Sequence, residues 1–125
     1  MTTAAALYSD VVRERWRHPR FLGTLTDATA EAEDVNPLCG DRVRIFVRVE
    51  DERVTAVRFV GDACAICLAA ADVMAELAQG RSSAEAERLG AADVLAVLRA
   101  DIRPARQRCV TLPLSVLASA LGRTR

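Results

Sequence analysis

An alternating run at residues 42–50, followed at once by a second apolar run, constrains the fold of this chain more than any other feature. In RVRIFVRVE the apolar side chains mostly fall on every second position, which is typical of a β-strand with one buried face. The buried face would carry Val43, Ile45, Val47 and Val49, and the exposed face Arg42, Arg44, Arg48 and Glu50. The sequence predicts an antiparallel hairpin in which DER is the turn and VTAVRFVG the second strand, with Val57 and Phe59 on the buried face.

Directly after the hairpin the pattern changes to that of helices. Residues 63–80, ACAICLAAADVMAELAQG, are rich in alanine, contain no proline and end at Gly80, a residue typical of the position just beyond a helix. Ser82 and Glu85 have the spacing of a capping box that begins a short helix. AADVLAVLRA predicts another helix. RPARQRCVTLPLSVLASALG predicts a final one that Pro113 should kink or divide.

The N-terminal part predicts one more helix. Leu7, Val11 and Val12 recur at helical spacing, and HPR ends the helix because the residue before a proline avoids helical backbone angles. FLGTLTDATAEAED is expected to form a loop followed by a weak strand. The order helix, strands, helices is typical of the α+β class. We expect a small antiparallel three-stranded sheet packed against an N-terminal helix and C-terminal helices, in a single domain spanning residues 1–125.

Composition excludes several classes of function. The chain has 17 basic and 17 acidic side chains in 125 residues, so no net positive charge points to nucleic acid or an anionic membrane as a partner. It contains no lysine, which removes Schiff-base chemistry, and His18 is its only histidine. The start lacks the pattern of a targeting segment, and no apolar run approaches the roughly 20 residues of a membrane span. We therefore expect a cytoplasmic protein whose thiols stay reduced.

Three of the four cysteines lie at predicted element boundaries. Cys39 precedes the first hairpin strand, Cys64 opens the alanine-rich helix, and Cys109 lies near the start of the last helix. Arg106 and Arg108 flank Cys109. A helix N-terminus favours the thiolate at Cys64, and the nearby arginines favour it at Cys109. Thiolates are the form of cysteine that binds metals and transfers sulfur.

The cysteine spacing leaves alternatives open. Only Cys64 and Cys67 form a C-x-x-C, and no second such pair completes a zinc finger. The alternating βαβ context of a thioredoxin-like redox pair is missing, and Cys67 within CLAAA is typical of a small buried side chain. Asp41 follows Cys39 on a turn opened by Gly40, so its carboxylate can reach the same centre as the thiolate. The residues alone fit four unrelated core cysteines, or one site of three thiolates and a carboxylate that holds zinc or an iron–sulfur cluster.

Four ordered segments carry the pattern of one protein family. They are NPLCGDRVRI, LYSDVVRERWRHPRFLG, FVGDACAICLAAADVM and RPARQRCVTLPLSVLASAL. Each resembles a segment of the scaffold proteins for iron–sulfur cluster assembly, the family of IscU, SufU and the N-terminal domain of NifU. The first resembles the family's Asn-Pro-x-Cys-Gly-Asp motif, and the last two resemble the segments that hold its second and third cysteines. The resemblance covers nearly the whole chain and implies the IscU/NifU-N-like fold.

The resemblance also implies a function and a site. Cys39, Asp41, Cys64 and Cys109 fall on the family's ligand positions. It implies a scaffold that accepts sulfur from a cysteine desulfurase, binds iron and a labile [2Fe-2S] cluster, and passes the cluster to apo iron–sulfur proteins. The carboxylate among sulfur ligands would make the cluster easier to lose, which suits a donor. One alternative is a SufU-type sulfurtransferase that binds Zn²⁺ at the same residues and relays persulfide, with Cys109 as the candidate acceptor. Another is a structural-zinc module without sulfur chemistry.

Departures from the family pattern bear on its subgroups. IscU-type members have a histidine before the third cysteine, where this chain has Arg108, whose protonated guanidinium does not bind metals. RPARQ replaces the LPPVK segment that a chaperone reads in IscU-type members. Both departures favour the SufU side. In contrast, the interval from Cys64 to Cys109 is too short for the insertion usual in SufU-type chains, so the subgroup stays open. Cys67 stands where a serine is usual, and its part in the site is also open.

Overall fold

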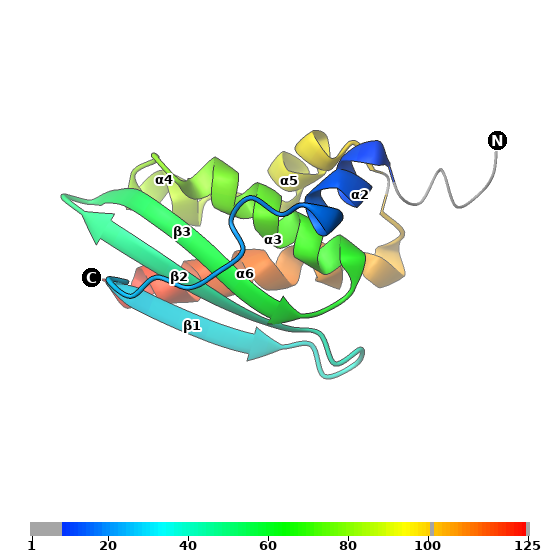
Figure 1. The fold of residues 1–125 in the computed structure, drawn as a ribbon, viewed down its shortest axis with the longest axis horizontal. Helices are drawn as coiled ribbons and strands as arrows, with labels where there is room; N and C mark the ends of the chain where they lie inside the picture. The colour runs from blue at the N-terminus through cyan, green and yellow to red at the C-terminus, as the bar shows by residue number, and fades with distance from the viewer. Residues whose placement is uncertain (1–8, 101, 125) are drawn as a thin grey trace.

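The fold places helices against one face of a three-stranded antiparallel sheet (Figure 1). The computed structural model of the chain describes residues 9–100 and 102–124. The strands are β1 (Ala30–Val35), β2 (Arg42–Glu50) and β3 (Arg53–Asp62), hydrogen-bonded in the order β1-β2-β3. The predicted α+β class and the predicted three-stranded sheet are both confirmed, including the weak strand before the hairpin.

Five α-helices lie in the described part of the chain. They are α2 (Asp10–Arg17), α3 (Ala65–Ala78), α4 (Ser83–Glu87), α5 (Ala91–Leu98) and α6 (Arg108–Gly122), and a short 3₁₀ turn at Pro104–Arg106 precedes α6. α3 packs on β3, and α6 packs on β1 and β2. α2 and α5 pack on α3, forming a further layer beyond it (Figure 1). None of these helices is long and apolar enough to cross a membrane.

The buried face of the hairpin lies against the helices, as the alternation predicted. Its core side chains are Val43, Ile45, Val47, Val57 and Phe59, all buried. In the ladder Ile45 faces Phe59 and Val47 faces Val57, so one apolar stripe crosses both strands. The tight turn forms at Asp51 and Glu52, whose φ angles of 51° and 62° give the twist that a two-residue hairpin loop requires.

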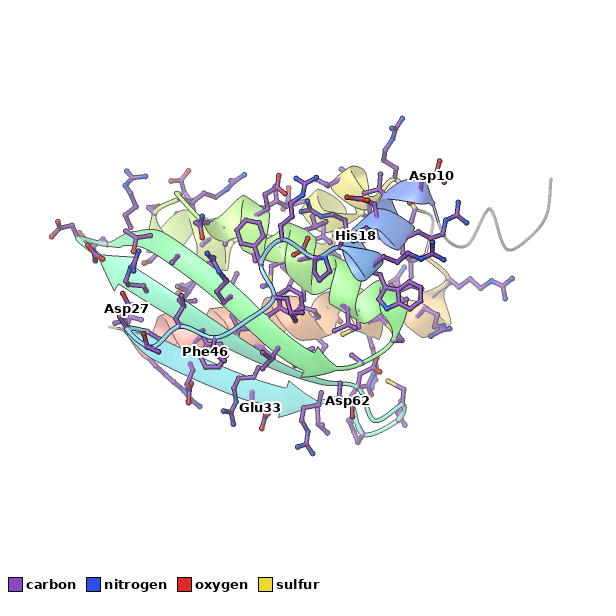
Figure 2. The ribbon with its side chains drawn as sticks, in the orientation of Figure 1. Asp10, His18, Asp27, Glu33, Phe46 and Asp62 are labelled. Atoms are coloured by element: carbon purple, nitrogen blue, oxygen red, sulfur yellow. The ribbon has the colours of Figure 1, made fainter. Side chains whose placement is uncertain are left out.

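The other face of the sheet is less exposed than the sequence predicted. Phe46 lies on this face and is buried (Figure 2). The segment between α2 and β1 crosses this face (Figure 1), where Asp27 pairs with Arg48 at 2.6 Å. Nearer α2, Phe59 exchanges backbone hydrogen bonds with Phe21 and Gly23, which covers the free edge of β3. The alternation alone contains no information about this long-range crossing.

The ends of α2 and α3 and the start of α4 follow the predicted signals. α2 ends at Arg17, with His18 as its C-cap before Pro19; its start, where Ser9 Oγ accepts from the Val12 N–H, was not predicted. The predicted contribution of Leu7 to this helix lies outside the described residues. Ser82 Oγ accepts from the Glu85 N–H at the start of α4, as the capping box predicted, and Gly80 follows the end of α3 with a φ of 96°.

Pro113 does not divide the last helix, so the division offered as one alternative in the sequence analysis is wrong. α6 is continuous from Arg108 to Gly122 with Pro113 inside it. Proline removes the N–H that would bond to the carbonyl of Cys109, four residues earlier, and its ring crowds that carbonyl. Buried residues on both sides of Pro113, among them Val110 and Leu117, hold the helix against the sheet and the other helices. Packing therefore compensates for the lost hydrogen bond.

Gly61 permits a close approach of β3 to β2 beside the first core residue, Val43. A Cβ at Gly61 would lie 2.9 Å from the Arg42 carbonyl oxygen and 3.3 Å from Leu68 Cδ2. We expect Gly61→Ala to lower the free energy of unfolding by about 1–3 kcal/mol, the usual cost of overpacking, as measured by urea unfolding. Gly122→Ala is the control, because a Cβ there meets nothing within 4 Å, and we expect it to cause no loss. Equal losses in both variants would contradict this account.

Candidate metal centre

Three of the four predicted ligand residues converge at one end of the sheet. Asp41, Cys64 and Cys109 each offer a ligand atom, and these atoms lie within 4.8 Å of one another. The two sulfurs are 3.5 Å apart, and Cys109 Sγ lies 3.8 Å from Asp41 Oδ2. Asp62, labelled in Figure 2, marks this end of the sheet. The residues come from the turn before β2, the N-cap of α3 and the first turn of α6, so only the tertiary fold brings them together.

The NPLCGD turn holds the carboxylate of Asp41 in place. The Asn36 N–H donates to the Asp41 carbonyl oxygen and the Gly40 N–H donates to the Asn36 carbonyl oxygen, both at 2.7 Å. Asn36 Oδ1 accepts from the Leu38 N–H at 3.0 Å. Gly40 has a φ of 79°, which a side chain would disfavour. The turn thus explains the Asn and Gly of the motif by local geometry, and it leaves Asp41 buried at 6% exposure.

Cys64 is the N-cap of α3, which confirms its predicted place at the helix start. Its Sγ accepts from the Cys67 N–H at 3.4 Å. Its own N–H donates to Asp41 Oδ1 at 3.1 Å. One carboxylate oxygen is therefore fixed by the backbone of Cys64, and the other faces the sulfur of Cys109. The thiol of Cys109 therefore lies near both other ligand groups, the half-buried thiol of Cys64 and the carboxylate of Asp41.

Cys109 is only 4% exposed, and this burial acts against the ionised form. Burial raises the pKa of its thiol to about 12, and the hydrogen bond with Cys64 and the charge of Asp41 act in the same direction. A hydrogen bond with Arg106 lowers the pKa but is outweighed. Arg106 therefore acts in the predicted direction, but burial outweighs it and favours the neutral thiol. A bound cation would favour the thiolate, because its charge lies directly against the sulfur.

The remaining two thiols lie in opposite environments. Cys39 is exposed on the turn, next to the 79% exposed Leu38, and it is not part of the three-residue group. Cys67 is fully buried, and this burial raises the pKa of its thiol. Cys67 thus matches the prediction of a small buried side chain. The ligand role of Cys39 stays a prediction. It requires the turn to move so that the thiol of Cys39 approaches the other three ligand groups.

A shallow groove beside the site was missed in the sequence analysis. It runs between the turn and α6, with Val35, Pro37 and Leu112 as apolar lining and Arg108 at its side. No local signal in the sequence marked it, because its two lining segments, 35–37 and 108–115, lie far apart in the chain. We call this surface, lined by Val35, Asn36, Pro37, Arg108, Thr111, Leu112 and Ser115, the α6 groove.

Comparison with known proteins identifies the family. The model of the NifU-like N terminal domain matches residues 7–124. The iron-sulfur cluster assembly scaffold protein IscU 1 of Archaeoglobus fulgidus is 29% identical over 115 residues, which cover 92% of this chain and 74% of the relative. The zinc-dependent sulfurtransferase SufU of Bacillus subtilis is 25% identical over 134 residues, covering 94% and 90%.

A solved structure agrees with these relatives. The crystal structure of a putative iron-sulfur cluster assembly scaffold protein for the SUF system, from Fervidobacterium islandicum AW-1, superposes with a TM-score of 0.81. It is 25% identical in sequence, and the match covers 94% of this chain and 98% of the other. The chain therefore belongs to the family of the NifU-like N terminal domain, the iron–sulfur cluster assembly scaffold family to which IscU and SufU are assigned.

Proposed function

We propose that this chain is a scaffold that accepts sulfur from a cysteine desulfurase, binds iron, builds a labile [2Fe-2S] cluster and passes it to apo iron–sulfur proteins. The observation that carries the proposal is the convergence of Asp41, Cys64 and Cys109 within 4.8 Å. Similarity to the IscU scaffold of Archaeoglobus fulgidus supports it. We place the chain in the cytoplasm, where its four free thiols stay reduced.

The donor set suits iron that is bound and then released. Two thiolates and a carboxylate fit ferrous iron, and the burial of Cys109 and Asp41 keeps water from competing for the metal. The oxygen ligand weakens the hold on a cluster relative to a fourth sulfur. Cys39 supplies the remaining sulfur ligand from its exposed turn. A ligand that exchanges between solvent and the site suits a centre that is repeatedly filled and emptied.

Exposure sets the order in which the thiols meet an incoming persulfide. Cys39 is exposed, Cys64 is half-buried and Cys109 is buried. A desulfurase presents its persulfide on a bulky protein, so Cys39 is the first acceptor. Cys109, the acceptor expected from the sequence, receives sulfur only from within the chain. The α6 groove and the exposed Leu38 give the desulfurase an apolar surface beside Cys39.

A second candidate is a zinc-dependent sulfurtransferase, the activity named for the SufU relative. The compactness of the site favours it. Tetrahedral zinc, with Zn–S bonds of about 2.3 Å, places two ligand sulfurs about 3.8 Å apart. The distances of 3.5 Å between Cys64 and Cys109 and 3.8 Å between Cys109 and Asp41 are of this size. The residues present thus fit Zn²⁺, which when bound would keep the thiols deprotonated.

Anaerobic reconstitution tests the scaffold. Incubation of the purified chain with ferrous iron and sulfide is expected to give the visible absorption of a [2Fe-2S] cluster, which an apo acceptor protein then removes. A chain that stays colourless while a known scaffold loads in parallel would overturn the proposal. A single zinc that survives purification, together with strong stimulation of a cysteine desulfurase, would instead favour the sulfurtransferase.

Replacing Cys39 tests whether a cluster needs a ligand that a single zinc ion does not need. Cys39→Ser is expected to abolish accumulation of the cluster but to retain zinc binding through Asp41, Cys64 and Cys109. Cluster absorption and metal content measure the two effects. Cys67→Ala is the matched control, because its thiol is buried outside the group, and it is expected to load normally. Normal cluster loading by Cys39→Ser would show that Cys39 is not a ligand.

A further inference from the structure

We propose that Cys64 and Cys109 form a dithiol couple that releases the sulfane sulfur of a persulfide as sulfide. Their sulfurs are 3.5 Å apart, and Cys64 is half-buried while Cys109 is buried. A persulfide formed on Cys64, the more accessible of the two, is attacked by Cys109. The entry of sulfur through Cys39 rests on the proposed function; its passage from Cys39 to Cys64 and the attack by Cys109 are additional steps.

The attack of Cys109 on the persulfide supplies the two electrons that convert its outer sulfur into the sulfide of a cluster. Sulfur reaches a scaffold as the outer atom of a persulfide, whereas a cluster contains sulfide. Converting one to the other requires that an S–S bond be broken with its electron pair going to the outer sulfur. A thiol held against the persulfide provides this pair without a separate reductant for the first turnover.

The distance between the two sulfurs suits a nucleophile, Cys109 Sγ, and the atom that it attacks, Cys64 Sγ. A distance of 3.5 Å lies at the edge of the range of about 3–3.5 Å that is typical of a near-attack geometry. A disulfide bond of about 2.05 Å requires the sulfurs to approach further. Both residues lie at helix starts, Cys64 as the N-cap of α3 and Cys109 in the first turn of α6. Side-chain rotation there brings the sulfurs together without disturbing a helix interior.

The atoms and electrons of the step balance. Cys109 Sγ forms a bond to Cys64 Sγ, the S–S bond of the persulfide breaks, and its electron pair leaves with the outer sulfur as hydrosulfide. The proton of the Cys109 thiol leaves with the outer sulfur, so that the hydrosulfide becomes hydrogen sulfide; Asp41 Oδ2 lies 3.8 Å from Cys109 Sγ. The Cys64 N–H holds the other carboxylate oxygen. The products are hydrogen sulfide and a Cys64–Cys109 disulfide, which a dithiol reductant returns to two thiols.

Metal-free protein in a Cys39→Ser background tests the couple, because this change removes the exposed thiol. The chain is treated briefly with sodium tetrasulfide, desalted and followed by intact mass. We expect the persulfide form to convert into a species two hydrogen atoms lighter than the reduced chain, with about one hydrosulfide released per persulfide. With Cys109→Ser added, the persulfide should last at least about tenfold longer. Equal lifetimes in the two proteins would overturn the proposal.

Peptide mapping identifies the partner of Cys109, in the unsubstituted chain and in Cys67→Ala. Trypsin cuts this lysine-free chain only after arginine, so Cys64 and Cys67 share the peptide 59–81 while Cys109 lies in 109–123. The proposed disulfide joins the two peptides, both in the unsubstituted chain and in Cys67→Ala. A disulfide within 59–81, or loss of the cross-link in Cys67→Ala, would overturn the assignment of Cys64 and Cys109.

Failure of this step is distinguishable from failure of the scaffold. Reconstitution with added sulfide bypasses the couple. A chain that loads a cluster from iron and free sulfide but keeps a stable persulfide on Cys64 would overturn the couple alone. A chain that forms the Cys64–Cys109 disulfide with release of sulfide, but binds no cluster, would support the couple and overturn the scaffold.

Discussion

Replacing Cys64 with serine is expected to weaken zinc binding at least about 100-fold, since even the loss of a group that only orients a ligand costs up to this factor. Serine preserves the local structure: its hydroxyl caps α3 as the thiol does, and its backbone N–H still donates to Asp41. The substitution therefore removes only a soft ligand that lies 3.5 Å from Cys109 Sγ. Competition with a chromophoric chelator measures the affinity on metal-free protein.

Cys67→Ala is the control for this prediction. It removes a thiol from the first turn of the same helix, but one that is fully buried and outside the group of Asp41, Cys64 and Cys109. We expect it to bind zinc as the unsubstituted chain does. If Cys64→Ser bound zinc equally well, the three-residue group would not be the metal centre. If both variants lost binding while far-UV circular dichroism stayed unchanged, the thiol of Cys67 would be part of the centre.

Local sequence signals predicted the elements of the fold because their causes are local. Alternation of Val43, Ile45 and Val47 is a property of one strand, and it placed these residues correctly on the buried face. The Ser82–Glu85 cap and the helix end before Gly80 depend on neighbouring backbone groups. Such signals need no knowledge of the rest of the chain.

The errors came from contacts between distant segments. Phe46 stands in the exposed phase of β2 but is buried, on the face crossed by the segment between α2 and β1, where Asp27 reaches Arg48. Pro113 breaks an isolated helix, but α6 packs on the sheet and on other helices on both sides of it. In both cases tertiary packing outweighed a local preference that had been interpreted correctly.

At the site too, local signals predicted the features that depend on neighbouring residues and missed those that depend on the tertiary fold. The turn motif and the element boundaries at Cys64 and Cys109 marked candidate ligands, because helix starts and turns are visible in a sequence. The degree of burial was not visible. Arg106 and Arg108 suggested an ionised Cys109, yet burial raises the pKa of this thiol. The exposure of Cys39 and the burial of Cys109, on which the proposed order of sulfur transfer rests, likewise needed the structure.

α3 connects this site to a second buried polar group, which stabilises the fold. Asp72 lies two turns after Cys64 and is fully buried. Its Oδ1 accepts from the N–H groups of Arg20 and Phe21, both at 2.8 Å, and its Oδ2 lies 2.9 Å from Nε of the buried Arg15. Burial raises the pKa of Asp72, and these donors oppose that shift. One carboxylate therefore holds both α2 and the segment that follows it.

Asp72→Ala is expected to lower the free energy of unfolding by about 3 kcal/mol. The change leaves the guanidinium of Arg15 without its buried partner and two backbone N–H groups without an acceptor. Removing one member of a buried ion pair costs about 3–5 kcal/mol, and the lower end applies because Glu76 still pairs with Arg15. Urea unfolding followed by the fluorescence of Trp16, the only tryptophan, measures the loss.

Asp27→Ala is the matched control, since it also removes the aspartate of an aspartate–arginine ion pair. This pair is exposed, and Arg48 keeps Glu50 at 3.1 Å, so we expect no measurable change in stability. Asp72→Asn should fall between the two, because its amide oxygen still accepts from the backbone but carries no charge for Arg15. If Asp72→Ala were as stable as Asp27→Ala, the carboxylate of Asp72 would not be needed to hold α2. Because Asp72 lies two turns from Cys64, we also expect folded Asp72→Ala to bind zinc normally, which would separate the group that stabilises α3 from the site at its start.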